Sequence, residues 1–464
     1  MTQQSFPRLM VAAPRKSSGK TMLSIGLVAG LAARGVVVQP FKKGPDFIDP
    51  RWLTFAANGR DCRNLDVFLM GQQAVRDRFV QSGADAGFSL IEGNHGLFDG
   101  QDIEGTDCGA GLAELLEAPV LLVVDCSGFA RGVAPLVQGL LDFPGGSRIK
   151  GVVLNNVATK RHETRLRAAL DRYCAVPIFG ALPRDANIVI DERHLGLTPV
   201  GEREELGDSI AVIRDFVVQH VDMDGIIALA NSASPLNVVP QPKPVPIDAP
   251  TIKVAYAADR AFSFYYPDNL EALEAEGVEL IPFSMLQDKK LPKVDGLFIG
   301  GGFPEMFMEE LAANHSMMAD IRQQVDLGLP VYAECGGLMV LAGQIQWHDR
   351  VSNFAGAIPI DIVMHRRPQG YGFMELTGTG ELSWPGKGRK IRCHEFHYSK
   401  VVRVGDGVKF AYNVTRGFGV DGSSDGIIYK NVFASYAHIH AASDKGWAKF
   451  LAGFWRQNRI KSVE

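Results

Sequence analysis

The stretch RLMVAAPRKSSGKTMLSIGLVAGLAARG, residues 8–35, decides the fold of the first half of the chain. A short apolar run leads into a loop that ends in Gly19-Lys20-Thr21, and the residues after it have the apolar spacing of a helix. This setting is typical of a phosphate cradle, in which Lys20 would span the β and γ oxygens and Thr21 would hold Mg²⁺. The tripeptide alone fits a plain turn with a solvated lysine equally well, but its two flanks favour phosphate binding.

Apolar runs recur along the rest of the chain, separated by helix-length stretches. Such runs suit strands buried on both faces, with crossover helices between them. Between residues 234 and 250, six prolines remove amide donors and fix φ, so neither a helix nor a central strand can run through. We therefore predict an α/β protein of two doubly wound domains, 1–233 with a mainly parallel sheet and 251–464, joined by a linker at 234–250.

Composition excludes several classes of protein. The 464 residues carry 48 Lys+Arg against 52 Asp+Glu, a formal charge of −4, whereas a nucleic-acid binder needs a basic face. The six cysteines form no CxxC pair and no zinc-like cluster, so neither a disulfide framework nor structural zinc is expected. No segment approaches the roughly 20 apolar residues of a membrane helix. We expect a cytoplasmic protein that binds no nucleic acid and no membrane.

Charged residues follow two apolar runs at the predicted carboxyl edge of the first sheet. Lys42, Asp46 and Asp49 come just after one run, and Glu92 ends another. Open α/β sheets bind ligands at this edge, and an acid opposite a phosphate loop can coordinate Mg²⁺. Turn chemistry is the alternative for the aspartates, and His95 fits a backbone-bonded loop residue as well as a ligand.

The second half centres on PVYAECGGLMVLAG, where Cys335 ends an apolar run directly before Gly336-Gly337. A tight turn here would aim the thiol outward, and the N-terminus of a following helix would lower its pKa, so that thiolate is available for attack. The alternative is a buried cysteine acting as a small hydrophobe. The two glycines favour the nucleophile, because they permit a strained turn.

A nucleophilic cysteine needs a base, and the stretch FASYAHIHAA supplies His438 and His440. Backbone amides of the Gly300-Gly301-Gly302 run would complete an oxyanion hole. Histidines at i and i+2 of a strand face the same side, which leaves a metal pair open, although no third ligand is evident. The nearby pair His394 and His397 suggests packing as readily as catalysis.

These stretches together resemble the cobyrinic acid a,c-diamide synthases. That family joins a dethiobiotin-synthetase-like P-loop domain to a flavodoxin-like class I glutamine amidotransferase domain, and its members amidate carboxylates at the expense of ATP and glutamine. The matching stretches run in order along almost the whole chain: SSGKT, QPFKKGPDFIDP, NLDVF, IEGNHGLFDG, GVVLNNV, ERHLGL, AFSFYYPDNL, GGGFPE, YAECGGLM, CHEFHYS and ASYAHIH.

The resemblance implies that the first domain phosphorylates the a- and c-acetate carboxylates of a tetrapyrrole. ATP would contact Ser17, Ser18, Gly19, Lys20, Thr21, Lys42 and Asn155, the last at the adenine. Thr21 and Glu92 would hold Mg²⁺. The carboxylate substrate would meet Asp46, Ile48 and Asp49.

For the second domain, the resemblance implies that Cys335 attacks the glutamine amide, with His438 as proton shuttle. Gly301 and Gly336 would provide the oxyanion donors. Ammonia would then cross to the acyl phosphate made by the first domain. Because amidoligases with paired α/β domains often form dimers, a homodimer is a further expectation.

Three features depart from the family pattern. Ala13 stands where family loops carry a glycine, and the charged pair Arg15-Lys16 replaces small polar residues. The pattern His438-Ile439-His440 lacks the glutamate of most class I relatives, so that either His440 or no residue at all would orient the catalytic histidine. The sequences APRKSSGKT and IEGNHGLFDG resemble those of a branch that amidates sirohaem or related sirohydrochlorins more than those of the vitamin-pathway branch.

A nucleotide-switched, partner-binding ATPase with a scaffold second domain is the alternative from another class.

Overall fold

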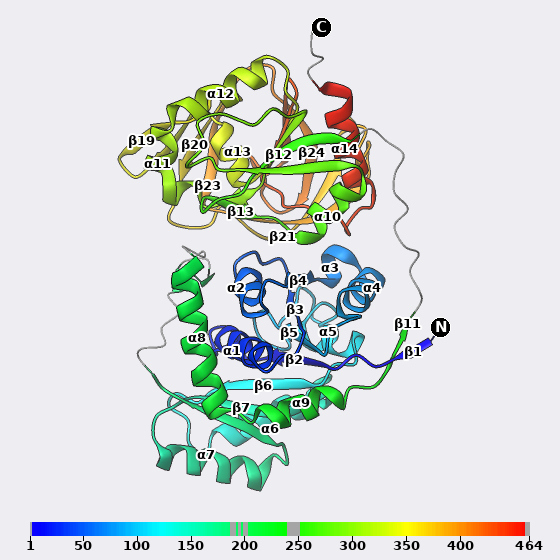
Figure 1. The fold of residues 1–464 in the computed structure, drawn as a ribbon, viewed down its shortest axis with the longest axis vertical. Helices are drawn as coiled ribbons and strands as arrows, with labels where there is room; N and C mark the ends of the chain where they lie inside the picture. The colour runs from blue at the N-terminus through cyan, green and yellow to red at the C-terminus, as the bar shows by residue number, and fades with distance from the viewer. Residues whose placement is uncertain (1, 186–191, 194–195, 198–202, 239–250, 460–464) are drawn as a thin grey trace. The chain divides into compact units, whose positions relative to one another are not determined.

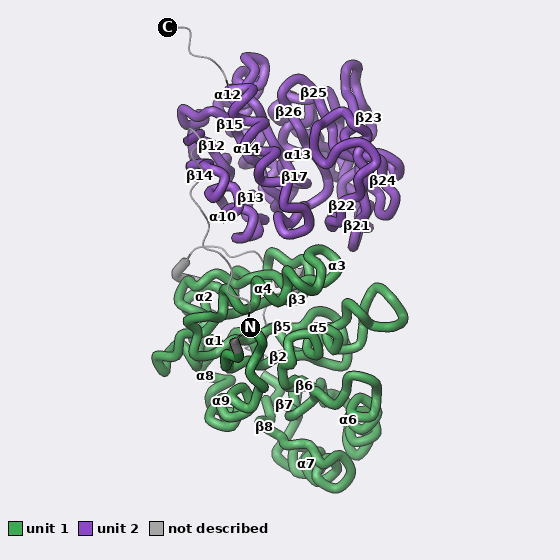
Figure 2. The backbone as a smooth tube through the Cα atoms, turned by 90° about the vertical axis from the view of Figure 1, so that its right-hand side faces the viewer, with its two compact units in different colours: residues 1–242 green, residues 243–464 purple. Residues whose placement is uncertain are grey.

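A computed structural model describes residues 2–185, 192–193, 196–197, 203–238 and 251–459 of the chain. It divides into two compact units, Met1–Pro242 and Lys243–Glu464, which Figure 2 draws in green and purple. Within the described residues, no helix combines the length and the apolar character that crossing a membrane requires.

A seven-stranded sheet forms the centre of the first unit, and its strands all run parallel in the order β4-β3-β5-β2-β6-β7-β8. Every residue of β2, β3 and β5 is buried, as expected where helices cover both faces of a sheet. This confirms the mainly parallel sheet. The strands are β2 (Arg8–Ala12), β3 (Val38–Lys43), β4 (Arg63–Leu65), β5 (Phe88–Glu92), β6 (Val120–Asp125), β7 (Ile149–Val157) and β8 (Ile178–Pro183).

Helices lie on the two faces of this sheet (Figure 1). The crossovers from β2 to β3 and from β6 to β7 run in opposite directions along the strand order, so right-handed connections place α1 and α6 on opposite faces. Helix α1 packs against α8, and α6 against α7. The helices are α1 (Lys20–Ala33), α2 (Asp49–Ala56), α3 (Val67–Met70), α4 (Gln72–Gly83), α5 (Gly109–Leu115), α6 (Val133–Asp142), α7 (Lys160–Tyr173), α8 (Arg203–His220) and α9 (Met223–Asn231).

The chain leaves the first unit later than the sequence predicts. Strand β11 (Leu236–Val238) pairs antiparallel with β1 (Thr2–Gln4), so the start of the predicted linker at 234–250 belongs to the first unit. A two-stranded edge tolerates the prolines around it, because its outer side needs no amide donors. The remainder of the predicted linker, from residue 239, lies outside the described residues, as does the stretch 198–202.

The second unit is built on a nine-stranded mixed sheet, β14-β12-β15-β17-β26-β25-β24-β21-β22. The five strands from β14 to β26 run parallel, and the rest continue antiparallel. The parallel part agrees with the predicted fold, whereas the antiparallel part was not predicted. The strands are β12 (Ile252–Ala257), β14 (Val278–Phe283), β15 (Gly296–Ile299), β17 (Val331–Glu334), β21 (Gly370–Gly378), β22 (Lys390–His397), β24 (Lys409–Arg416), β25 (Ser424–Tyr429) and β26 (Val432–Ser435).

Smaller elements complete the second unit. A four-stranded sheet contains β19 (Arg350–Asn353), β18 (Gln344–Trp347), β20 (Ile360–Met364) and β23 (Ser399–Val404). The short strands β13 (Phe262–Phe264) and β16 (Gly301–Gly302) pair with each other. The helices are α10 (Pro267–Ala275), α11 (Met308–Ala313), α12 (His315–Asp326), α13 (Gly336–Leu341) and α14 (Gly446–Asn458). Trp447 and Trp455 of α14 are fully buried in the core.

A buried arginine ties the ends of the first unit together. Arg8, which is fully buried, donates to the carbonyl oxygens of Leu116 at 2.6 Å, Phe6 at 2.9 Å and Ser234 at 2.7 Å. It also reaches the carbonyl of Glu117 at 3.3 Å. Burial lowers the pKa of this guanidinium to about 10, so it stays charged near neutral pH. One side chain therefore joins β2, the turn before β6 and the segment after α9.

Replacing this side chain should destabilise the first unit. Arg8→Met fills a similar volume but leaves the carbonyls without donors, which costs about 3 kcal/mol. In calorimetry of the full chain, we expect the transition of the first unit to move to lower temperature while that of the second unit stays in place. Arg76→Met, which removes an exposed arginine of α4, is the matched control. Equal effects of the two substitutions would contradict the assignment.

Candidate active sites

The P-loop closes against the sheet at a position that only glycine tolerates. Gly19 has φ +96°, and a Cβ added to it would lie 2.1 Å from the side-chain nitrogen of Asn155. That nitrogen donates to the carbonyl of Ser18 at 2.9 Å. Asn155, near the end of β7, thus fixes the P-loop through the backbone of Ser18. Its contact with adenine stays a prediction.

Within the loop, Ser17 is exposed with φ 56°, and the hydroxyl of Ser18 donates to the carbonyl of Arg15 at 3.0 Å. The unusual Arg15 reaches Asp125 at the end of β6, with 3.0 Å between guanidinium and carboxylate. Asn156 donates to the same carboxylate at 3.0 Å. The charged loop residue is therefore paired with a neighbouring strand end, and neither Asp125 nor Asn156 was predicted from the sequence as a site residue.

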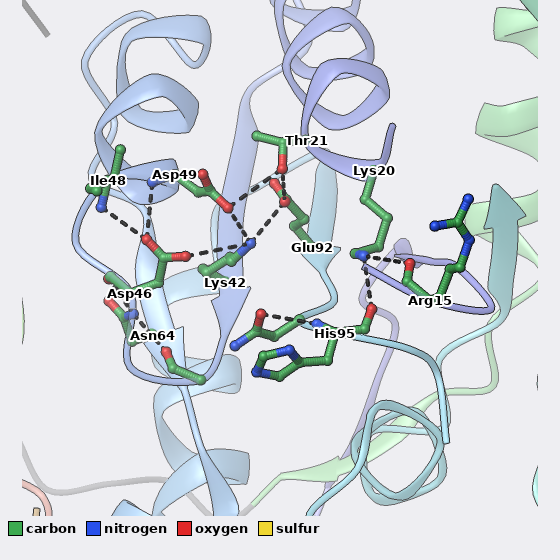
Figure 3. A network of polar contacts seen from close by, with 12 residues as sticks. Arg15, Lys20, Thr21, Lys42, Asp46, Ile48, Asp49, Asn64, Glu92 and His95 are labelled. Carbon is green, nitrogen blue, oxygen red and sulfur yellow. Dashed lines mark hydrogen bonds and ion pairs between the residues drawn. The ribbon is translucent and has the colours of Figure 1, made fainter. Parts of the chain in front are cut away.

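Lys20 points back over the loop, as Figure 3 shows. Its ammonium donates to the carbonyl of His95 at 2.8 Å and lies 3.4 Å from the carbonyl of Arg15. Burial, followed by repulsion from Lys42, lowers the pKa of Lys20 to about 8. His95 contributes its backbone to this contact, in agreement with the loop interpretation. An incoming phosphate would replace weak carbonyl acceptors by strong anionic ones.

A second charged group lies at the ends of β3 and β5, where Lys42 is surrounded by carboxylates (Figure 3). Its ammonium is 2.5 Å from Asp49, 2.8 Å from Glu92 and 3.7 Å from Asp46. Burial alone would lower the pKa of Lys42, but attraction to Asp49 and Glu92 outweighs it and raises the pKa well above its usual value. The lysine therefore stays charged in the interior.

Asp46 and Ile48 shape the turn before α2. The carboxylate of Asp46 accepts from the amide of Ile48 at 2.9 Å and from that of Asp49 at 3.1 Å. Burial, together with repulsion from Asp49, raises the pKa of Asp46 to about 7. Asp46 thus performs the turn role proposed as an alternative and also faces Lys42, whereas Ile48 takes part through its backbone.

The residues predicted to bind Mg²⁺ lie together. The hydroxyl of Thr21 donates to Glu92 at 2.6 Å and lies 3.4 Å from a carboxylate oxygen of Asp49. The other oxygen of Glu92 is buried and has no hydrogen-bond partner among the described residues. Burial, then repulsion from Asp49, raises the pKa of Glu92. A divalent cation would satisfy this oxygen, and the hydroxyl and carboxylate donors fit Mg²⁺.

The protein would supply only part of such a coordination shell. The described residues contain no group of three or more His, Cys, Asp or Glu side chains arranged as a metal site. Mg²⁺ commonly keeps waters and phosphate oxygens as its other ligands. Thr21 and Glu92 therefore fit a cation that arrives with a nucleotide.

In the second unit, Cys335 occupies the strained turn predicted for a nucleophile. It follows β17 directly, precedes α13, and has φ 45° and ψ −100°. Its side chain is 5% exposed, and Sγ lies 3.7 Å from the carbonyl of Phe396. The predicted low pKa is wrong: burial, followed by repulsion from Glu305, raises the pKa of the thiol far above its usual value. A helix of six residues does not offset this, so attack by Cys335 requires a base.

His438 comes close to this turn because two parallel strands end side by side. Strand β17 pairs with β26, with Glu334 opposite Ser435, and the amide of Cys335 donates to the carbonyl of Ser435 at 2.7 Å. The chain then continues to His438, whose Nδ1 lies 3.4 Å from a carboxylate oxygen of Glu334. Glu334 was not among the residues predicted from the sequence, although it directly precedes Cys335.

The remaining histidines stabilise this region. His394 of β22 exchanges two backbone hydrogen bonds with His438, at 3.3 and 2.8 Å, and their rings stack with centroids 4.9 Å apart. His397 lies on Tyr436 at a centroid distance of 3.7 Å. Nδ1 of His440 accepts from the amide of Ala442 at 3.1 Å. Among the described residues, His438 and His440 belong to no group of three or more His, Cys, Asp or Glu side chains arranged as a metal site.

Glycines lie beside His438 and directly after Cys335. A Cβ on Gly301 would lie 2.5 Å from Cε1 of His438, and one on Gly336 would lie 3.1 Å from the amide nitrogen of Gly302. A side chain at position 301 would collide with His438, and one at position 336 would crowd Pro304 and Gly302. The amide of Gly300 already donates to the hydroxyl of Tyr265 at 2.8 Å, so it is not an oxyanion donor here. Gly301 and Gly336 stay predicted donors.

Comparison with known proteins covers both units. Residues 9–197 match the CobQ/CobB/MinD/ParA nucleotide binding domain, and residues 253–446 match the CobB/CobQ-like glutamine amidotransferase domain. A solved structure titled as a glutamine amidotransferase covers 44% of this chain and 98% of its own, at 18% identity and a TM-score of 0.34, which is too low to bear on the fold.

Full-length relatives carry one name. A cobyrinate a,c-diamide synthase of Magnetococcus marinus is 57% identical over 97% of this chain and 98% of its own. Proteins of the same name from Archaeoglobus fulgidus, 38% identical over 96% of each chain, and Methanosarcina barkeri, 37% identical over 99% of this chain and 98% of its own, match equally completely. The chain therefore belongs to the cobyrinate a,c-diamide synthase family of glutamine-dependent amidating ligases.

Proposed function

We propose that this protein converts the a- and c-acetate carboxylates of a cobyrinic-acid-type tetrapyrrole into amides, using ATP and glutamine. The observation that carries the proposal is the presence, in one chain, of a P-loop with a buried acid beside Thr21 and of a strained cysteine turn beside His438. The first arrangement suits phosphoryl transfer and the second suits amide hydrolysis. The names of the relatives supply the substrate class.

The cysteine half releases ammonia. His438 takes the thiol proton of Cys335, and the sulfur forms a bond to the amide carbon of glutamine. The C–N bond then breaks, and the departing nitrogen receives the proton from His438 as ammonia leaves. Water hydrolyses the resulting thioester to glutamate. A base is needed because burial keeps the free thiol protonated.

The P-loop half prepares the carboxylate. Lys20 and the loop amides neutralise the phosphates, Lys42 holds charge at the site of transfer, and Thr21 with Glu92 would hold Mg²⁺. Bound Mg²⁺ supplies charge neutralisation of the phosphate oxygens. A substrate carboxylate oxygen attacks the γ-phosphorus and ADP leaves, which gives an acyl phosphate. Ammonia then displaces phosphate to form the amide.

A substrate panel tests the choice of macrocycle. The purified protein with ATP, Mg²⁺ and glutamine would receive cobyrinic acid, hydrogenobyrinic acid, sirohaem or nickel sirohydrochlorin, and mass spectrometry would identify the products. We expect two successive amidations of the cobyrinic-acid-type substrates. Conversion of only sirohaem or nickel sirohydrochlorin would instead assign the protein to the branch that amidates those substrates. Conversion of none would defeat the substrate proposal.

Two substitutions should separate the half-reactions. Cys335→Ser should lower glutamine-dependent amidation at least about 1000-fold, because the nucleophile is lost, yet preserve amidation with ammonium chloride. Lys20→Met should abolish amidation from either nitrogen source, because the phosphates lose their cation. Product formation is measured with each source. Normal glutamine use by Cys335→Ser would contradict the proposal and support the scaffold alternative.

The lowered pKa of Lys20 predicts a pH dependence of nucleotide binding. Lys20 is charged below its pKa of about 8 and neutral above it, so affinity for Mg²⁺-ATP should fall as pH rises through 8. The fall approaches about tenfold per pH unit above that point. Titration calorimetry between pH 7 and 9.5 measures it, and Lys20→Arg, whose side chain stays charged, should flatten the slope. A wild-type affinity that is constant across this range would be inconsistent with the assignment.

A further inference from the structure

Glu334 is a buried acid next to the proposed nucleophile, and it has no role in the mechanism proposed above. It ends β17, is 2% exposed, and directly precedes Cys335. One carboxylate oxygen, Oε2, lies 3.4 Å from Nδ1 of His438. A buried carboxylate needs partners for its charge, and the imidazole is one of them.

The other oxygen of Glu334 is fixed by two donors. The hydroxyl of Tyr332 donates to Oε1 at 2.6 Å, and the amide of Ile439 lies 3.4 Å from the same atom. The indole nitrogen of Trp447, in α14, lies 3.4 Å from the hydroxyl oxygen of Tyr332. These contacts join β17 to the segment that carries His438. The carboxylate therefore has one oxygen engaged by the core and the other directed at the imidazole.

His440 is engaged elsewhere. Its Nδ1 accepts from the amide of Ala442, and its ring packs on Tyr266 with centroids 4.6 Å apart. This residue stands where most class I relatives carry the glutamate that orients the catalytic histidine. The strand position before the cysteine supplies the carboxylate instead.

We infer that Glu334 is the positioning residue for His438, taking the place of the missing glutamate at position 440. This inference rests on the proposed roles of Cys335 and His438. In this role Glu334 accepts a hydrogen bond from the N–H at Nδ1 and keeps the proton there, which leaves Nε2 unprotonated and able to take the thiol proton. Its charge then stabilises the imidazolium while sulfur attacks the amide. The edge of the ring that bears Nε2 and Cε1 lies beside Gly301.

Glu334→Gln tests this role with little change in shape. Because two donors hold Oε1, the new amide group would turn its NH₂ toward Nδ1 and favour the wrong tautomer of His438. We expect kcat for glutamine hydrolysis to fall at least about 100-fold, with KM for glutamine within about threefold of wild type. Inactivation by a chloroketone analogue of glutamine should slow in parallel, while amidation with ammonium chloride is retained.

Two further variants complete the test. Glu334→Asp keeps the charge but withdraws it, so its rate should lie between those of wild type and Glu334→Gln. His440→Asn keeps an acceptor for Ala442 and should hydrolyse glutamine within about threefold of wild type. Retained ammonia-dependent activity shows that the first unit is folded, and an unchanged calorimetric transition of the second unit shows that the substituted unit is folded as well.

The outcomes distinguish failure of the role proposed for Glu334 from failure of the proposed amidating function. If Cys335→Ser abolishes glutamine hydrolysis but Glu334→Gln does not, the role of Glu334 is wrong and the proposed function stands. If His440→Asn causes the larger loss, His440 is the orienting residue. If Cys335→Ser hydrolyses glutamine normally, the proposed function fails together with the inference.

Discussion

Parallel strands of a sheet end at one edge, and both chemical sites of this protein depend on that constraint. In the first unit, the loop after β2 and the ends of β3 and β5 bring Thr21, Lys42 and Glu92 together from three separate parts of the chain. In the second unit, the adjacent ends of β17 and β26 bring Cys335 near the segment that carries His438. The ladder of backbone hydrogen bonds fixes these positions, so the side chains need only the right identity.

Burial raises the pKa of acidic groups in both sites, with different consequences. The first gathers Lys42 with three carboxylates, and burial, with repulsion from Asp49, raises the pKa of Asp46 and Glu92. One oxygen of Glu92 has no hydrogen-bond partner among the described residues, and a metal ion that arrives with a nucleotide would satisfy it. The second site has a protonated thiol, because burial raises its pKa. A base must therefore act before this sulfur could attack a substrate.

Much of this arrangement could be predicted from the sequence. Buried strands appear as uninterrupted apolar runs, and the glycines beside Lys20 and Cys335 mark tight turns, so the first sheet and both turns were found from local patterns. The antiparallel strands of the second unit were missed, because alternating exposure makes them resemble ordinary surface segments. The pKa of Cys335 was wrong in direction, since sequence proximity to a helix start says nothing of how deeply the thiol is buried.

The sequence by itself determined the α/β class, the P-loop, the identity of the candidate nucleophile and the family. Only the tertiary structure decided that Arg8 ties the segment after α9 to β2, that Asn155 contacts the P-loop, and that Glu334 faces the imidazole of His438. The physical reason is range: turns and strands follow from neighbours along the chain, whereas these partners lie roughly a hundred residues or more apart. They meet only when strand pairing and burial fix the directions of their side chains.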